Sequence, residues 1–514
     1  MLTLVLCAVA LPALGQPQTY LEYQGTGGNL GDASQWYVIT NKYDPASRAV
    51  PPQNRLPLSD TDWAYVRNGT TSTLNAYTRS NRFHVGGEEI LDSSGNKVPQ
   101  AASTVHVGTG GTIWCGVSTT ANGQLRVGNA YDGNVYQSNG VVYAKKHIIV
   151  GGSPGTTGRY EISGGLLTTA DGTMYFGRDG GTGIITQTGG TVRSPGADTG
   201  LGTLMIGSRG TTSYGEYNLV NGYMNFEQFS IGEPYEGLGG TGVFNQSGGS
   251  IKVRFGGVGD MSYGVVNLSG GTFESGFTVG QNFGTGHFNI SGGTFLQTGT
   301  PWIALGNSTG VVTMTGGLWA LNAAWRYDIN VGQVGWGPGE NVPGGFGHLR
   351  FLGGTARLTG TGIYLRSGRI TLGQDLVDLT AGNLRLFGPT GDYSTSMEII
   401  LGDDRNFNAH FCKKGDKRYG FESLGADLLV TLKDGFKPTP GQEWRIFTAD
   451  TYSGAFASIP AGYKVDIRGI GGSHETPYEF YLVYIPEPAT MGLLALGALG
   501  MLRRRRVSLT GNMQ

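Results

Sequence analysis

Glycine recurs at regular intervals along the middle of the chain, and this spacing constrains the fold more than any other feature. Units of one pattern, a glycine followed by a short alternating stretch and then Gly-Gly or Asn-Gly, begin at residues 133, 158, 183, 215, 242, 264, 286, 310 and 347. Such self-similarity indicates a repeat architecture, in which each unit buries its apolar face against the next unit. Glycine supplies 92 of the 514 residues, and its periodic placement distinguishes the chain from a glycine-rich linker.

Within each unit, apolar and polar residues alternate with a period of two, which is typical of half-buried β-strands. The units show no helical period, and their glycine pairs suit corners between short strands. We therefore predict an all-β fold, a right-handed parallel β-helix (β-solenoid), with its repeats over residues 105–395. The third position of the unit is always apolar, as Val135, Tyr160, Ile185, Tyr217, Phe244, Val266, Phe288, Val312 and Leu349, whereas the fifth is apolar except for Gln137, Gln187 and Gln246.

Asparagine occupies the same place in four successive units, at Asn218, Asn245, Asn267 and Asn289. Equivalent positions of neighbouring strands lie about 4.8 Å apart in a stack. The spacing therefore predicts a ladder of stacked amides along one face.

The segments on either side of the repeat do not follow its pattern. An open end of a stack exposes unpaired backbone groups, so it needs a cap. We expect residues 16–104 to form an irregular N-terminal β cap. Residues 396–484 alternate like antiparallel strands with Gly and Pro at the turns, which predicts a small antiparallel β cap or module at the C-terminal end.

Charge and metal-ligand spacing exclude several classes of function. Lys and Arg total 36 against 37 for Asp and Glu, so no basic field is present to recruit nucleic acid. The seven histidines are scattered, and Cys115 and Cys412 are isolated, so no metal-ligand spacing appears. We predict no cofactor and no metal, and we assign no catalytic residue. His147 follows two lysines, which fits a basic spot for an acidic sugar or, more simply, a solvated strand edge.

The N-terminus has the pattern of an export signal. An apolar run is followed by Ala13-Leu14-Gly15, a small-x-small cleavage pattern. We therefore expect residues 1–15 to be a signal peptide and the mature protein to lie outside the cytoplasm.

The C-terminus combines three features in order: Pro486-Glu487-Pro488, an apolar run over 489–502, and Arg503, Arg504, Arg505 and Arg506. Residues 485–507 closely resemble the PEP-CTERM sorting signal of exported bacterial proteins. The resemblance implies recognition by a membrane protease of the exosortase type, with transfer to the cell surface or matrix, and an association with exopolysaccharide. The apolar run predicts a C-terminal helix that anchors the chain transiently in the inner membrane, with the arginines on the cytoplasmic side. The body is similar, more loosely, to autotransporter-like β-helical repeats.

Tryptophans cluster where two successive unit starts lie farthest apart, between residues 310 and 347. Insertions in repeat proteins map to loops, which often bind ligands. One hypothesis is that Trp319, Trp325 and Trp336 contact a polysaccharide. The simpler alternative is that these rings pack beneath the loop.

These observations favour a structural or adhesin-like surface protein that is not an enzyme. A β-helical carbohydrate-active enzyme, such as a polysaccharide lyase or hydrolase, is the alternative, and it requires charged side chains from adjacent repeats in one groove. Ice binding ranks lower, because the row with Thr191, Thr272 and Thr294 is interrupted by Val141, Ser250 and Leu318.

Overall fold

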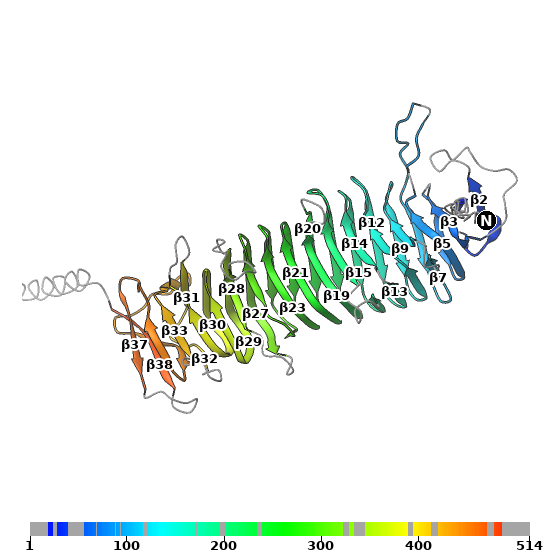
Figure 1. Cartoon of the computed structure of the whole chain (residues 1–514). Coiled ribbons are helices and arrows are strands. Elements are labelled where there is room, and N and C mark those ends of the chain that lie inside the picture. The colour runs from blue at the N-terminus through cyan, green and yellow to red at the C-terminus, as the bar shows by residue number, and fades with distance from the viewer. Residues whose placement is uncertain are drawn as a thin grey trace, which may run out of the picture.

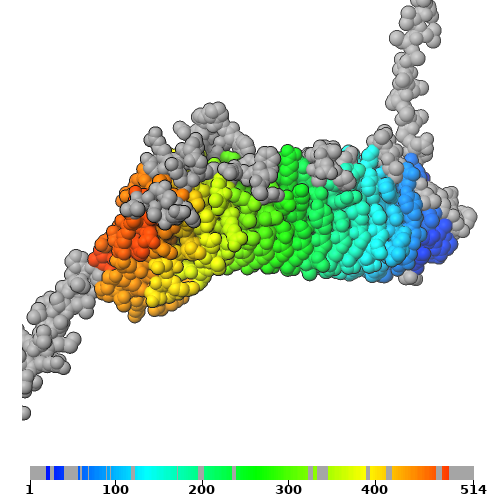
Figure 2. Space-filling model, turned by 90° about the horizontal axis from the view of Figure 1, so that it is seen from below, coloured from blue at the N-terminus to red at the C-terminus, as the bar shows by residue number. Residues whose placement is uncertain are grey.

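The computed structural model describes residues 19–485, apart from 24–27, 40–55, 68, 88, 93, 117–121, 171, 195–201, 234–238, 322–327, 334–344, 389–393, 413–419 and 470–476. Nearly all of its regular structure is β-strand; one short 3-10 helix, η1 (Ala33–Gln35), is the exception in this described part. The strands stack side by side along an elongated body (Figure 1). In Figure 2 the colours cross this body in bands that follow the chain order.

The strands form three parallel rows, and each repeat unit adds one strand, or one part of a long strand, to each row. We call such a set of three a rung. The first row contains β4 (Thr71–Leu74), β6 (Ser103–Val107), β9 (Gly133–Gln137), β12 (Thr157–Ile162), β15 (Thr182–Gln187), β18 (Tyr214–Leu219), β20 (Thr241–Gln246), β22 (Tyr263–Leu268), β24 (Thr285–Ile290), the opening parts of β27 (Thr309–Leu321), β29 (Phe346–Leu365) and β30 (Gly368–Leu386), β31 (Thr395–Leu401) and β34 (Asp427–Leu432).

The second row begins with the opening parts of β3 (Leu58–Val66) and β5 (Tyr77–Val85) and continues through the middle parts of β29 and β30. Its other members are β7 (Thr112–Cys115), β10 (Val141–Ala144), β13 (Leu166–Thr169), β16 (Thr191–Arg193), the opening parts of β19 (Tyr223–Glu233), β21 (Ser250–Asp260) and β23 (Thr272–Gln281), β25 (Thr294–Gln297), the end of β27, β32 (Ala409–Phe411) and β35 (Glu443–Ala449).

The third row takes the closing parts of the long strands β3, β5, β19, β21, β23, β29 and β30. Its other members are β1 (Thr19–Tyr23), β8 (Gln124–Val127), β11 (His147–Val150), β14 (Thr173–Arg178), β17 (Thr203–Ser208), β26 (Trp302–Leu305), β28 (Ile329–Gln333), β33 (Phe421–Leu424) and β36 (Tyr452–Ala455). The prediction of an all-β fold built from parallel strands is therefore confirmed.

The glycine starts of the repeat units align rung by rung. Gly158 pairs with Gly133 on one side and with Gly183 on the other, and the register continues unit by unit to Gly347. We call these aligned glycines the glycine column. Glycine is required there because the backbones of adjacent rungs approach closely: a Cβ on Gly183 would lie 2.2 Å from the Val150 carbonyl oxygen. The spacing read from the sequence is thus the register of the stack.

The third-position residues form the centre of the core. All nine are at most 1% exposed, and burial of each large apolar side chain contributes roughly 1.5–3 kcal/mol. Aromatic rings continue from rung to rung, with centroids 5.6 Å apart between Tyr217 and Phe244 and 5.4 Å apart between Phe295 and Trp319. Because each rung packs on the next, the core runs along the whole stack.

The fifth-position glutamines point into the core and bind the corner backbone. Gln187 Nε2 donates to the carbonyls of Gly190 (3.2 Å) and Tyr223 (3.3 Å), and its Oε1 accepts from the Tyr217 hydroxyl at 2.6 Å. Gln137 and Tyr160 repeat the same side-chain contact, also at 2.6 Å. The buried amides are therefore hydrogen-bonded themselves, and each adds a second donor to a corner carbonyl such as that of Gly190, which also accepts from Tyr223 N at 3.1 Å.

The predicted asparagine ladder is present. Asn245 donates to Asn218 at 2.9 Å, Asn267 to Asn245 at 2.8 Å, and Asn289 to Asn267 at 2.9 Å. At its N-terminal end, Asn218 donates to Glu216 at 2.8 Å. Asn245, Asn267 and Asn289 thus each donate to the equivalent residue of the preceding rung, as the spacing predicts.

The stack extends beyond the expected repeat limits of 105 and 395. Parallel pairs begin with β1 and β3 and continue to β33 and β36, so the proposed boundaries at 104 and 396 coincide with no change of pairing. Backbone ladder bonds do not require the glycine pattern, and the flanking rungs form without it. Antiparallel pairing occurs at the two ends: β1 with β2 (Trp36–Ile39), and β38 (Tyr478–Tyr484) with both β35 and β37 (Tyr463–Arg468).

Candidate functional site

The two targeting segments predicted from sequence lie outside the described residues. These are the signal peptide at 1–15 and the C-terminal signal with Pro486, Glu487, Pro488, the anchor helix and Arg503–Arg506. The last described strand, β38, ends at Tyr484, directly before the signal. Among the residues that the structure describes, no helix is long and apolar enough to cross a membrane.

Trp319 belongs to the core, which corrects its assignment as a carbohydrate contact. The residue is fully buried, and its ring packs between Phe295 and Phe351, at centroid distances of 5.4 and 6.0 Å. Its Nε1 donates to Gln297 Oε1 at 3.0 Å. The alternation within β27 directs this side chain inward, towards the core residues of the neighbouring rungs. Trp325 and Trp336 lie outside the described residues.

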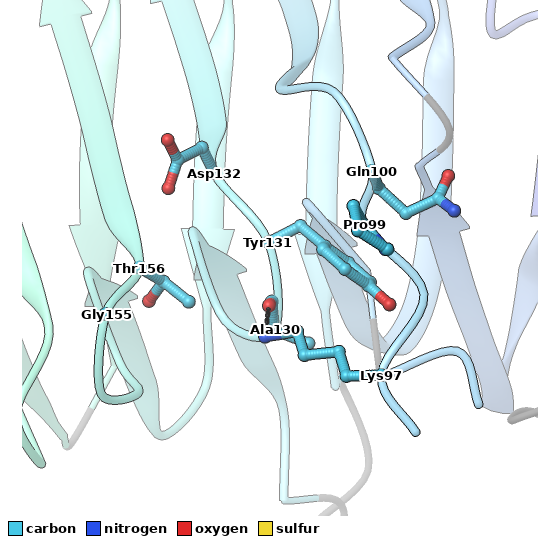
Figure 3. A pocket seen from close by; sticks show the side chains of 8 residues that line it. All are labelled: Lys97, Pro99, Gln100, Ala130, Tyr131, Asp132, Gly155 and Thr156. Carbon is cyan, nitrogen blue, oxygen red and sulfur yellow. Dashed lines mark hydrogen bonds between the residues drawn. The ribbon is translucent and has the colours of Figure 1, made fainter. Parts of the chain in front are cut away.

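A shallow pocket lies near the N-terminal end of the stack, between the segment around Lys97 and the corners of two successive rungs (Figure 3). Its volume of about 280 Å³ falls just below the roughly 300–1,000 Å³ that is usual for ligand pockets. Its lining residues are Lys97, Pro99, Gln100, Ala130, Tyr131, Asp132, Gly155 and Thr156. In Figure 3, the Lys97 side chain runs below the Tyr131 ring towards Ala130, and Asp132 and Thr156 lie to the left of the ring.

Three polar side chains of this pocket already form hydrogen bonds with backbone groups of the protein. The Lys97 ammonium donates to the Ala130 carbonyl and lies 4.8 Å from the Tyr131 ring centroid. The Tyr131 hydroxyl accepts from Ile90 N at 2.9 Å, and burial raises the pKa of this phenol. Asp132 accepts from Thr157 N at 2.7 Å. The contacts of Lys97 and Ile90 hold the Lys97 segment against the stack. The residues that line this pocket include no nucleophile beside a general base.

A polar network crosses four rungs of the first row near the C-terminal end. His348 Nε2 lies 2.7 Å from Thr371 Oγ1, whose hydroxyl donates to Glu398 Oε2 at 2.8 Å, and Thr431 donates to Glu398 Oε1 at 2.7 Å. Burial and the charges of Arg350 and Arg369 lower the pKa of His348 to about 4. At neutral pH the network thus holds a neutral imidazole beside a carboxylate.

His147, one of the sequence candidates for a basic spot, is neutral at physiological pH. Burial and the Arg178 charge lower the pKa of its imidazole to about 4. The ring packs edge to face on Tyr175, at a centroid distance of 5.6 Å. His147 therefore adds no positive charge for an acidic sugar.

Two carboxylates occupy equivalent positions on adjacent rungs. Glu233 ends β19 and Asp260 ends β21, and the parallel register places them side by side. Burial, with the nearby Asp260 charge, raises the pKa of Glu233, and burial likewise raises that of Asp260. Asn282 Nδ2 donates to Asp260 at 3.0 Å. Two neighbouring carboxyls are the groups that glycosidases use as an acid–base or acid–nucleophile pair.

A mixed cluster of His410, Cys412 and Asp450 joins two rungs at the C-terminal end of the stack. Neither Cys412 nor Cys115 forms a disulfide. Burial and the Asp450 charge raise the pKa of the Cys412 thiol to about 11, so this thiol is protonated at neutral pH and is a poor nucleophile. Sequence reasoning missed this cluster. The available signal was His-x-Cys at the end of a strand, where a period of two directs both side chains to one face.

Comparison with known proteins identifies the C-terminal segment. Residues 485–506 match the PEP-CTERM protein-sorting motif. This match supports an exported protein that an exosortase sorts to the cell surface, as the sequence resemblance implies. Neither a curated protein nor a solved structure matches the chain.

Proposed function

We propose that this chain is an exported surface or extracellular-matrix protein whose body is a β-solenoid of the right-handed parallel β-helix type. The observation that carries the proposal is the sorting motif at 485–506, which follows β38 directly. In this proposal the apolar run over 489–502 and the arginines after it hold the chain transiently in the inner membrane until an exosortase acts at Pro486-Glu487-Pro488.

The role of the body is structural or adhesin-like. Its polar side chains form contacts between rungs, as in the asparagine ladder and the network around Glu398. Such contacts stiffen a stack along its axis, because each one joins neighbouring repeats. A stiff, elongated body suits a protein that extends from the cell surface into a matrix.

Processing of intact protein tests the sorting step. The full chain is expressed in an exopolysaccharide-producing host with an exosortase, cells are fractionated, and intact masses are measured. We expect loss of mass C-terminal to about Pro486 and recovery in the surface or matrix fraction. The matched control carries Pro486→Ala, Glu487→Ala and Pro488→Ala, and it should keep the full C-terminus. An unprocessed, soluble wild-type chain would contradict the proposal.

Exopolysaccharide is the proposed partner of the exposed body, and Trp325 and Trp336 remain the proposed contacts. The Trp325→Ala/Trp336→Ala double variant should be retained less than wild type on the host's own exopolysaccharide. Circular dichroism establishes that the variant is folded. Equal retention of both proteins would remove these two rings from the proposal while leaving the sorting step untouched.

The second candidate function is a β-helical carbohydrate-active enzyme, favoured by the pairing of Glu233 with Asp260 on adjacent rungs. Reducing-sugar release or lyase absorbance with the host's polysaccharide measures it, and Glu233→Gln and Asp260→Asn should each abolish any activity. Ice binding stays the lower alternative, because Tyr223 and Leu318 interrupt the row that holds Thr191, Thr272 and Thr294.

A further inference from the structure

The strand geometry brings one thiol, one imidazole and one carboxylate together at the C-terminal end of the second row. His410 lies within β32, and Cys412 follows that strand by one residue, so both side chains lie on the same face. Asp450 follows β35, the next strand of the row. Backbone bonds fix both segments, since Asp450 N donates to Phe411 O at 3.1 Å and Cys412 N donates to Ala381 O at 2.8 Å.

The three side chains are close enough to share one ion. Their ligand atoms all lie within 4.8 Å of one another, and His410 Nε2 is 3.1 Å from Asp450 Oδ1. Metal–ligand bonds of about 2.0–2.3 Å in a tetrahedral site place ligand atoms roughly 3.3–3.8 Å apart. Small side-chain rotations therefore suffice to close the three donors around an ion.

Thr448 orients the imidazole for this role. Its hydroxyl lies 2.7 Å from His410 Nδ1 and donates to the Ala409 carbonyl at 3.4 Å. When Nε2 binds the ion, Nδ1 carries the ring proton and donates it to the Thr448 hydroxyl, whose own proton is directed to the Ala409 carbonyl. A hydrogen bond from the second ring nitrogen is the arrangement that orients histidine ligands in metal sites. The side chains of His410 and Asp450 are only 13% and 11% exposed, so both donors are largely buried.

We propose that His410, Cys412 and Asp450 bind a zinc ion, with solvent in the fourth position. Sulfur, nitrogen and oxygen donors together suit zinc, whereas calcium and magnesium prefer oxygen ligands alone. On binding, a Zn–S bond replaces the S–H bond of Cys412, and the proton goes to solvent. The ion joins β32 to the segment after β35, so it cross-links two rungs where the stack ends.

Zinc and cobalt titrations of the folded full chain test the site. Metal-free protein, prepared by dialysis against a chelator, is titrated with zinc in competition with a chromophoric chelator. We expect one equivalent of zinc per chain, a rise in the thermal unfolding midpoint on binding, and a thiolate-to-metal charge-transfer band when cobalt replaces zinc. Cys412→Ser should abolish the cobalt band and the stoichiometric binding, and Asp450→Asn should weaken binding strongly.

Two further variants separate ligands from background binding by the other histidines. His348→Gln removes a comparable, partly buried imidazole and should leave zinc binding unchanged. Thr448→Val should keep one equivalent and the cobalt band but lower the affinity about 10–100-fold, as expected of a group that only orients a ligand. Equal zinc binding by wild type and Cys412→Ser overturns the proposal, and so does the lack of one bound equivalent in folded wild type.

Discussion

Individual residues that break the apolar pattern carry specific hydrogen bonds in this stack. Gln187 stands at a position that is otherwise mostly apolar, and it is fully buried. Its amide nitrogen donates to two corner carbonyls, and its amide oxygen accepts from the Tyr217 hydroxyl. A buried amide without these partners would be costly, so the glutamine and the tyrosine of the next rung stabilise each other.

Removing one hydroxyl tests this account. Tyr217→Phe leaves the Gln187 carbonyl oxygen without its 2.6 Å donor, which should lower the free energy of unfolding by about 1–3 kcal/mol. Urea unfolding followed by circular dichroism measures the change. Tyr263→Phe is the control, because Tyr263 is 44% exposed and should cost close to nothing. Equal stability of the two variants would contradict the assigned role.

Two histidines make the stability depend on pH. The pKa of His147 and that of His348 fall from near 6.5 to about 4 in the folded chain. The unfolded chain therefore binds protons at a higher pH than the folded chain does, so stability is greatest above about pH 6.5 and is lost as the pH falls towards 4. The urea midpoint should fall across this window. A His147→Gln/His348→Gln variant should show a flatter profile, and an unchanged profile would exclude these two groups as the cause.

At the scale of the element, the backbones of adjacent rungs lie so close at the glycine column that only glycine fits there. Gly183 contacts the carbonyl of the preceding rung, and its equivalents occur in every unit that the sequence predicts. Gly257 in β21 differs, because a Cβ there would meet nothing within 4 Å. Glycine is thus sterically required at position 183, whereas the structure leaves room for a side chain at position 257.

This contrast predicts opposite effects of the same substitution. Gly183→Ala places a Cβ 2.2 Å from a backbone oxygen and should destabilise the stack by about 1–3 kcal/mol or more. Gly257→Ala should be neutral or stabilise by about 0.4–1 kcal/mol, since alanine restricts the unfolded chain. Thermal and urea midpoints of both variants decide, and a Gly183→Ala protein as stable as wild type would contradict the register of the glycine column.

At the scale of the whole molecule, the stack of rungs makes the chain elongated (Figures 1 and 2). A compact protein of 514 residues has a radius of gyration of about 24 Å. Small-angle X-ray scattering of the exported protein should give a clearly larger value and a rod-like region in the curve. A radius near the compact value would show that the rungs do not stack along one axis in solution.

Much of the architecture was predictable from local pattern. The glycine starts, the third-position core residues and the asparagine ladder all follow from periodicity, because each neighbour in a stack is the equivalent residue of the next unit. The flanking rungs were not predicted, because strands such as β3 and β33 pair through backbone bonds and their sequences lack the glycine pattern. The tryptophan hypothesis was wrong for Trp319, because proximity to an insertion does not determine on which face of a strand a residue lies.

The sequence by itself determined the parallel register of the repeats and the sorting motif, because each depends on a residue pattern within short, contiguous stretches. Only the tertiary structure decided where the stack ends, why glutamines are buried in it, and which distant groups meet. Asp450 lies one rung beyond His410 and Cys412, because β33 and β34 come between β32 and β35 along the chain, and the sequence of this rung lacks the glycine pattern. Their contact depends on how the last rungs stack, and local periodicity contains no information about that.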